Sequence, residues 1–200
     1  MARLPRSFFE RFTPLVARSL LGCRLVRVIG SERLSGTIVE TEAYRGSRDP
    51  ASHAFRGKTR RNEVMFGPAG HAYVYFTMGA HYCLNVTTEG EGTAAAVLVR
   101  AVEPLEGIEK MKINRGLDET AKLASGPGNL TRAFGIDKAL NGEDMIDSRR
   151  LFIQKGTGLD RIGVSSRVGI SAGTSFRWRY FAEGNPFVSK GRPSRGAGNP

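Results

Sequence analysis

The chain has 200 residues, of which 40% are hydrophobic and 24% charged, as is usual for one globular domain with its own core. Its 30 lysines and arginines against 19 acidic residues give a net charge of +11. This charge favours a polyanionic partner, nucleic acid before an acidic membrane. No apolar run is long enough to cross a bilayer, and no secretory leader is predicted. Cys23 and Cys83 fit neither a disulfide nor a metal framework, so we expect buried free thiols in a reducing, intracellular compartment.

The N-terminal part is predicted to form two short helices and a β-hairpin. The second helix begins at Thr13 and Pro14, a capping residue followed by the residue type preferred in the first turn. Residues 23–29 alternate apolar side chains with arginine, residues 30–33 form a turn, and residues 34–43 give the partner strand.

Residues 36–44 are the most informative stretch of this hairpin. Successive side chains of a strand point to opposite faces, so Glu40, Glu42 and Tyr44 lie on one face. They form either a solvated surface, which is the commoner arrangement, or a carboxylate held over an aromatic surface that takes a proton from water. Features further along the chain favour the second interpretation.

A long basic loop follows the hairpin. Residues 45–62 contain one acid, Asp49, and a loop of this length inside a domain is usually functional or disordered. His53 lies in the loop, although a lone loop histidine is more often inert than catalytic. Basic residues expected to contact nucleic-acid phosphates are Arg45, Arg56, Lys58, Arg60 and Arg61, together with Arg177 and Arg179 near the C-terminus.

Two aromatic-rich strands at residues 71–76 and 81–87 flank a tight turn, which predicts a second hairpin. Tyr73 and Tyr75 share one face of its first strand, an arrangement most common in a plain core. Met78 stands at the tip, where polar residues are usual. Because Met is among the side chains that proteins insert between base steps, we hypothesise that Met78 fills the gap left by an unstacked nucleotide.

Residues 94–102 form an apolar run that predicts a central strand, and Arg100 is its one charge. A charge inside a buried strand is costly unless it is paired. We therefore expect a carboxylate beside Arg100, with Glu42 as the candidate; a strand-end arginine that reaches solvent is the alternative. Glu103-Pro104 is predicted to open a helix.

The second half of the chain carries weaker patterns. Short helices are predicted at 118–124 and 129–134, the second after a Gly-Pro-Gly turn, and short strands at 151–153 and 176–181. From Ser189 onward the composition turns to Gly, Pro, Ser and Arg. This predicts one domain over residues 1–188 and a disordered basic tail over residues 189–200. We find no internal repeat and no second domain.

Several ordered blocks together resemble the alkyladenine (3-methyladenine) DNA glycosylase family. The blocks are residues 38–44 followed by His53, Tyr73-Val74-Tyr75, Cys83-Leu84-Asn85, residues 98–107 and residues 125–128, with weaker similarity at residues 167–170 and 185–189. Blocks in this order, at compatible spacing over residues 5–189, are far more specific than any one of them. The resemblance implies an α+β domain with a curved, mainly antiparallel sheet flanked by helices, and a protruding hairpin that inserts into DNA.

The resemblance further implies a monofunctional enzyme of base excision repair, which flips damaged purines out of duplex DNA and hydrolyses the N-glycosidic bond. Alkylated and deaminated purines of this class include 3-methyladenine, 7-methylguanine, hypoxanthine and ethenoadenine. By the family pattern, Glu42 deprotonates the attacking water and Arg100 helps to hold that water. The flipped base would be enclosed by Tyr44, His53 and Tyr75, with Asn85 at the pocket floor, where it disfavours the exocyclic amine of guanine.

By the same resemblance we expect a monomer without metal or cofactor, and no membrane partner. It would act in the cytoplasm, at the nucleoid of a bacterium, or in a nucleus, on double-stranded DNA that contains damaged purines. The chain departs from the family at the hairpin tip, where the best-known members carry a tyrosine and this chain has Met78. His81 also stands at an aromatic family position and is assigned no role.

Other functions fit parts of the pattern. A non-catalytic basic module that binds nucleic acid explains the charge and the aromatic residues, but not Glu42 facing a basic surface. A lyase with a nucleophilic lysine, or a helix-hairpin-helix glycosylase using Asp137 or Asp144, lacks an activated lysine or an aromatic pocket. The three histidines lack the spacing of metal ligands. Glu40 and Glu42, about 7 Å apart on one strand, could be a glycosidase pair by distance, but sugar-binding features are missing.

A geometric expectation separates the two glutamates. Glu42 should lie near Arg100 in a cleft lined by the three aromatic side chains that enclose the base. Glu40 should lie outside that cleft, as a strand-surface acid or as the partner of a nearby arginine.

Overall fold

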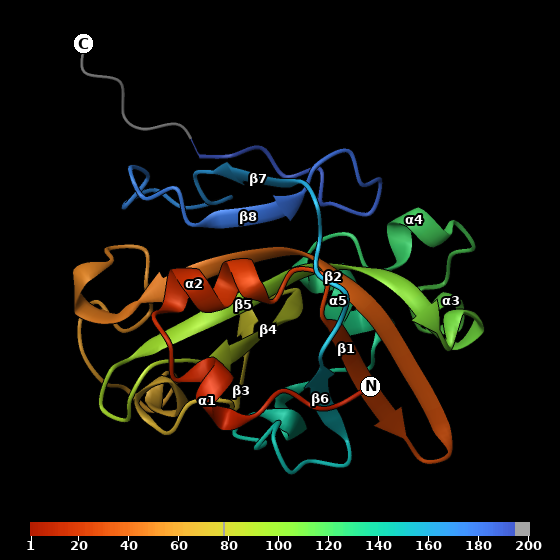
Figure 1. Cartoon of the computed structure of the whole chain (residues 1–200), viewed down its shortest axis with the longest axis horizontal. Coiled ribbons are helices and arrows are strands. Elements are labelled where there is room, and N and C mark those ends of the chain that lie inside the picture. The colour runs from red at the N-terminus through yellow and green to blue at the C-terminus, as the bar shows by residue number, and fades with distance from the viewer. Residues whose placement is uncertain (78, 195–200) are drawn as a thin grey trace.

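An eight-stranded sheet organises the chain (Figure 1). The computed structural model describes residues 1–77 and 79–194. The helical segments are α1 (Arg6–Phe9), α2 (Thr13–Ser19), η1 (Gly46–Arg48), η2 (Glu63–Phe66), α3 (Ile108–Arg115), α4 (Thr120–Leu123), α5 (Pro127–Ala133) and η3 (Lys138–Leu140). The strands are β1 (Arg24–Ile29), β2 (Glu32–Arg45), β3 (Ala72–Thr77), β4 (His81–Thr87), β5 (Ala95–Glu106), β6 (Leu151–Gln154), β7 (Ile162–Ser165) and β8 (Arg179–Ala182).

Strand β2 connects the two parts of the sheet. The main order is β3-β4-β5-β2-β1-β6, and β8 pairs with both β2 and β7, always antiparallel. Residues 32–37 of β2 pair with β1, and residues 40–42 pair with β8. Register shifts against β5 fall on both sides of Glu40. Because such bulges bend a strand and increase its twist, β2 leaves β1 and meets β8, which lies with β7 above the rest of the sheet (Figure 1).

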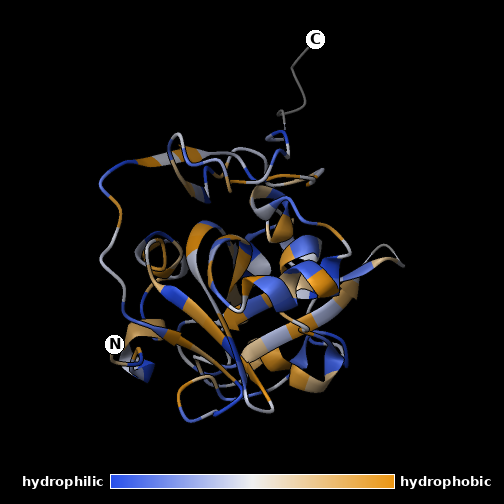
Figure 2. Cartoon of the chain, turned by 90° about the vertical axis from the view of Figure 1, so that its right-hand side faces the viewer, coloured by the Kyte–Doolittle hydropathy of each residue, from blue (hydrophilic) through white to orange (hydrophobic). Residues whose placement is uncertain are grey.

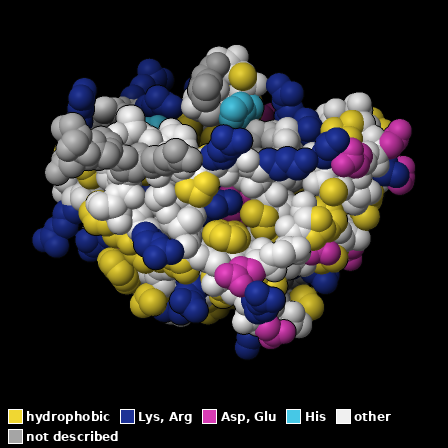
Figure 3. Space-filling view, turned by 90° about the horizontal axis from the view of Figure 1, so that it is seen from above, with side chains coloured by type: hydrophobic (Ala, Val, Ile, Leu, Met, Phe, Trp, Pro, Cys, Tyr) yellow, Lys and Arg dark blue, Asp and Glu magenta, His cyan; other side chains and the backbone are white. Residues whose placement is uncertain are grey.

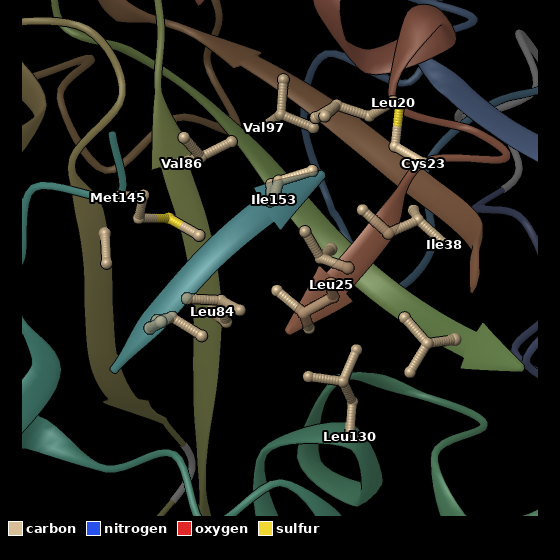
Figure 4. Close-up of a cluster of buried hydrophobic side chains, with 14 of the residues drawn as sticks. Leu20, Cys23, Leu25, Ile38, Leu84, Val86, Val97, Leu130, Met145 and Ile153 are labelled. Carbon is tan, nitrogen blue, oxygen red and sulfur yellow. The ribbon is translucent and has the colours of Figure 1, made fainter. Parts of the chain in front are cut away.

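The alternation of side chains along β3, β4 and β5 separates the core from the site. Val74, Leu84 and Val97 point into the main apolar core, where they join side chains from α5 and the end of α2 (Figure 4). Tyr75 and Asn85, one position away along their strands, face the opposite side. In Figure 2 the apolar stretches lie mainly in the strands and helices of the body, whereas the outer loops are largely polar.

The predicted α+β class, with a curved antiparallel sheet flanked by helices, is confirmed, as are both hairpins and the central strand. The helix predicted to open at Glu103-Pro104 is wrong, because β5 continues to Glu106 and α3 begins at Ile108. Pro104 pairs with Gly36 beside a register shift, and a bulge is one of the few places where a strand accepts proline. Cys23 and Cys83 are buried free thiols, as predicted.

The first residues of the predicted tail belong to the fold. The N–H of Ser189 donates to Glu40, and the N–H of Ser194 donates to the carbonyl of Arg167. The folded region therefore extends at least to Ser194, and residues 195–200 lie outside the described residues. No helix in the described part of the chain is long and apolar enough to cross a membrane.

Candidate active site

A cavity of about 240 Å³ lies on the face of β3, β4 and β5 that is turned away from the main core. Residues from the β2–β3 connection, the start of α5 and the segment 168–170 complete its walls. The predicted site residues that line it are Tyr44, His53, Tyr75, Asn85 and Arg100. The fold thus gathers at one cavity side chains from four separate parts of the sequence.

Glu42 lies directly behind this wall and is fully buried. Its Oε2 accepts hydrogen bonds from the Tyr44 hydroxyl at 2.8 Å and from Nη1 of Arg100 at 3.3 Å. Its Oε1 accepts from the backbone N–H of Val168 at 2.7 Å. All three donors line the cavity. An ionised carboxylate has about four acceptor positions, so these three donors leave one position on Oε1 that no other described residue uses.

The charges at this wall are fixed by their partners. Burial opposes the charge of Arg100, but the carboxylates of Glu42 and Glu40 outweigh it and raise the pKa of the guanidinium. Burial, and then the neighbouring Glu42, raise the pKa of Tyr44 well above its ordinary value. The site therefore holds a permanent cation and a neutral phenol against one carboxylate, and both donate hydrogen bonds to it.

Glu40 lies outside the cavity lining and is the partner of nearby arginines, which is one of the two arrangements expected of it; the other, a strand-surface acid, is wrong. It is fully buried, and its Oε1 accepts from Nε of Arg100 at 2.8 Å and from Nε of Arg179 at 2.7 Å. Burial opposes its charge, but Arg100 and Arg179 outweigh burial and lower the pKa of Glu40. Strand β8 runs beside this part of β2, where Phe181 pairs with Glu40. Arg179 is buried in this ion pair and does not present the phosphate-binding surface that was expected of it.

Aromatic rings line one side of the cavity. The ring centroids of His53 and Tyr75 lie 4.5 Å apart at 74°, and those of Tyr73 and Tyr75 lie 5.2 Å apart. Nδ1 of His53 is 3.0 Å from the hydroxyl of Tyr73. Burial raises the pKa of Tyr73 to about 12 and that of Tyr75 well above its ordinary value, so both remain neutral phenols. Tyr73 was not among the predicted site residues, although the strand face it shares with Tyr75 was the available signal.

We expect His53 to be neutral at pH 7. Desolvation, and then the positive charge of Arg61, lower its pKa below the ordinary value of 6.5. Removing a nearby positive charge favours the protonated ring, so Arg61→Gln should raise the titration midpoint of His53 toward 6.5. A proton NMR titration of the ring measures both midpoints. A midpoint in the variant that stays unchanged or falls contradicts this prediction.

A segment with only weak sequence similarity forms the opposite wall, through Val168, Gly169 and Ile170. The neighbouring Arg167 is fully buried and donates to Oδ2 and Oδ1 of Asp49 at 2.5 and 2.7 Å. Its guanidinium also lies 4.6 Å from the ring centroid of Tyr44. This anchor fixes the wall that supplies the backbone N–H to Glu42.

The basic residues at the end of β2 and in the β2–β3 connection that were predicted to contact phosphates divide into two groups. Four that were predicted to contact phosphates are exposed: Arg56, Lys58, Arg60 and Arg61. Arg45, in contrast, forms an ion pair with Glu89 at 2.8 Å. Lys and Arg side chains also lie at several places on the face shown in Figure 3, whereas acidic groups gather mainly toward one side of it.

Met78 lies outside the described residues, so the structure describes only the hairpin on either side of it. Thr77 and His81 form the last pair between β3 and β4. Asn85, near the other end of this hairpin, donates from Nδ2 to the carbonyl of Tyr73 at 3.0 Å. Within residues 1–77 and 79–194, no group of three or more His, Cys, Asp or Glu side chains could hold a metal ion.

Known proteins resemble the chain over almost its whole length. Residues 7–186 match the family model described as methylpurine-DNA glycosylase. A protein of Carboxydothermus hydrogenoformans named "Putative 3-methyladenine DNA glycosylase" is 51% identical over 189 residues, 94% of this chain and 98% of its own. Proteins of the same name from Chlorobaculum tepidum and Methanocella arvoryzae are each 46% identical, over 96% of this chain and 93% and 98% of their own.

Proposed function

Because the chain belongs to the methylpurine-DNA glycosylase family, we propose that it removes alkylated and deaminated purines from duplex DNA with a water that Glu42 activates. It is a DNA glycosylase, a hydrolase of N-glycosyl bonds. The observation that carries the proposed mechanism is the buried pair of Glu42 and Arg100 at the wall of a small, aromatic cavity, which Arg100 lines.

The chemistry needs one base. A purine alkylated at N3 or N7 is positively charged and leaves readily as a neutral base, so acid catalysis contributes little for that class, whereas hypoxanthine and ethenoadenine are neutral and must take up a proton from solvent as they leave. Glu42 takes a proton from water, the water oxygen forms a bond to C1′ of the sugar, and the bond from C1′ to the purine nitrogen breaks. The electron pair of that bond stays with the purine. A positioned general base contributes roughly 10²- to 10⁴-fold to such a step.

The carboxylate also has an electrostatic role. The sugar acquires oxocarbenium character as the base departs, and a negative charge fixed in a water-poor site stabilises that cation. Arg100 supports this role in two ways. Its Nη1 donates to Oε2 of Glu42 and holds that carboxylate in place, and its position on the cavity wall lets it orient the attacking water.

The cavity suits a single base. Its volume of about 240 Å³ is below the roughly 300–1,000 Å³ of pockets for drug-sized ligands, so we propose that one flipped base enters. The neutral rings of Tyr44 and Tyr75 attract a cationic purine, with cation–π energies of roughly 0.5–2 kcal/mol. In the same proposal, His53 completes the aromatic enclosure. Asn85 disfavours guanine, because it conflicts with the exocyclic amine of that base.

The proposed partner is double-stranded DNA with damaged purines, bound by a monomer in the compartment that holds the DNA. The exposed side chains of Arg56, Lys58, Arg60 and Arg61 would contact phosphates, so affinity should fall as salt rises. We also propose that Met78 enters the duplex at the hairpin tip, as apolar wedges do when a step is unstacked.

Base release tests the function directly. Duplexes that carry hypoxanthine, ethenoadenine, 3-methyladenine or 7-methylguanine are incubated with the protein, and abasic sites are cleaved with alkali. We expect release of at least one damaged base, and strand cleavage only after alkali. Binding without release at several salt concentrations would show a non-catalytic module instead, and cleavage without alkali would show a lyase.

A further inference from the structure

Residues 189–194, here called the C-terminal strap, contact the residues behind the cavity wall. Ser189 donates to Glu40 twice, from its N–H to Oε2 at 2.8 Å and from its hydroxyl to Oε1 at 2.9 Å. The same hydroxyl accepts from Nη2 of Arg100 at 3.4 Å. Because Arg100 also donates from Nε to Glu40 at 2.8 Å, these three residues form a closed triangle of hydrogen bonds.

The other end of the strap holds the wall that carries Val168. The N–H of Ser194 donates to the carbonyl of Arg167 at 2.8 Å, and its hydroxyl accepts from the N–H of Ile170 at 3.0 Å. Pro193 pairs with Val168 in an isolated β-bridge. Arg167 and Ile170, the residues on either side of Val168–Gly169, are therefore both hydrogen-bonded to Ser194.

The middle of the strap, at Gly191, passes close to Val168 and Arg100, which both donate hydrogen bonds to Glu42. A Cβ added to Gly191 would lie 2.7 Å from Cγ1 of Val168 and 3.4 Å from Nη2 of Arg100. The shorter distance is below any ordinary carbon–carbon contact, so the Val168 side chain or the strap would have to move. Glycine is the residue that lets the strap pass at this distance.

Glu40 balances the positive charge of the arginines that it holds. It accepts four hydrogen bonds from the described residues, two of them from Arg100 and Arg179. Three of these donors meet Oε1 and one meets Oε2, so Glu40 receives four donors where Glu42 receives three. Two glutamates and two arginines cancel one another's charge in this buried cluster, and Arg100 divides its donors between the two carboxylates.

We propose that the C-terminal strap is a positioning element of the glycosylase: Ser189 and Glu40 fix Arg100, and Gly191 and Ser194 fix Val168. Arg100 and Val168 are two of the three donors that orient Glu42. The strap thereby sets the direction in which Glu42 presents its remaining acceptor position to the water. This inference rests on the proposed role of Glu42 and adds residues that do not touch the cavity contents themselves.

The test compares Ser189→Ala, Ser189→Thr and Gly191→Ala with the full-length wild type. Single-turnover release from a hypoxanthine duplex is measured at saturating protein, together with affinity for a duplex carrying a tetrahydrofuran abasic analogue and the thermal midpoint. Ser189→Ala should slow release about 10-fold, which is the size of one hydrogen bond to a charged group. Gly191→Ala should slow it at least as much, and Ser189→Thr should restore it. Ser31→Ala removes an exposed hydroxyl at the β1–β2 turn and serves as the matched control.

Affinity for the abasic duplex should stay near wild type in all four variants, and all should remain folded at the assay temperature, although Ser189→Ala and Gly191→Ala should lower the thermal midpoint. Release rates equal to wild type in Ser189→Ala and Gly191→Ala would overturn the proposal that the strap positions Arg100 and Val168. A slower release that is fully explained by weaker DNA binding or by less folded protein would overturn it as well. Glu42→Gln, assayed in the same experiment, distinguishes a failure of the strap proposal from a failure of the proposed role of Glu42. If Glu42→Gln is inactive and the strap variants are normal, only the strap is wrong; if Glu42→Gln is active, the proposed function of Glu42 is wrong.

Discussion

Substitution of Glu42 by Gln is expected to slow base release by roughly 10²- to 10⁴-fold, the contribution of a positioned general base, while duplex binding is kept. The amide has the shape of the carboxylate but neither its charge nor its basicity. Its oxygen can still accept from the Tyr44 hydroxyl or from the Val168 N–H, while its nitrogen faces the donor on the other side, so some stability is lost although Arg100 keeps its bond to Glu40. Single-turnover release and affinity for an abasic-analogue duplex, measured on the same preparation, give the two quantities.

The matched control is Glu32→Gln at the opposite end of the same strand. Glu32 is exposed, and Lys110 approaches its carboxylate at 3.3 Å. Exposed ion pairs contribute only about 0–1 kcal/mol, so this variant should release bases at the wild-type rate. Full activity of Glu42→Gln would move the chemistry to another group. Equal losses in Glu42→Gln and Glu32→Gln would point to damage to β2 rather than to catalysis.

Substitution of Asp49 by Asn is expected to lower the free energy of unfolding by about 3–5 kcal/mol, the cost of leaving a buried charge without its partner. Both Asp49 and Arg167 are fully buried, and both oxygens of the carboxylate accept from the guanidinium. The amide nitrogen of Asn would face a donor. At roughly 2–4 °C per kcal/mol for a chain of this size, the thermal midpoint should fall by about 6–20 °C.

Glu183→Gln supplies the comparison for Asp49→Asn. The pair of Arg161 with Glu183 has side chains 80% and 43% exposed, so its loss should cost less than about 1 kcal/mol. Urea unfolding of both variants gives the two free energies. A change in Asp49→Asn as small as that in Glu183→Gln would show that Arg167 finds another partner or water. It would also remove the argument that this pair anchors the wall at Val168.

Local sequence patterns predicted the parts of the fold that depend on neighbouring residues. The β-branched run through Ile38 and the apolar run before Arg100 became β2 and β5, because alternation and continuous hydrophobicity are properties of the strand itself. The pairing of Glu42 with Arg100 was also predictable, since a buried arginine on a central strand requires a carboxylate on a neighbour. Pro104 was misassigned because its place beside a bulge depends on the register with Gly36.

The burial of Glu40 and its hydrogen-bond partners could not be predicted from residues near it in the sequence. Its partners Arg179 and Ser189 follow it by 139 and 149 positions, and strand β8 brings them over β2. Alternation placed Glu40 and Glu42 on one face, but the number of donors around each carboxylate depends on these distant segments. The same holds for Val168, whose contribution is a backbone N–H that no side-chain pattern reveals.

The order of the chain has a consequence for its synthesis. Glu42 meets Arg100 across 58 positions and the N–H of Val168 across 126, and the strap follows at Ser189. Contacts between residues so far apart in the chain form slowly, because the intervening loop must first be closed. A nascent chain that ends before Val168 already contains β1 through β7 but cannot complete the carboxylate's surroundings. Base-releasing activity, as proposed, thus arises only after Val168 and the strap have left the ribosome, and translation products that lack them would not create abasic sites.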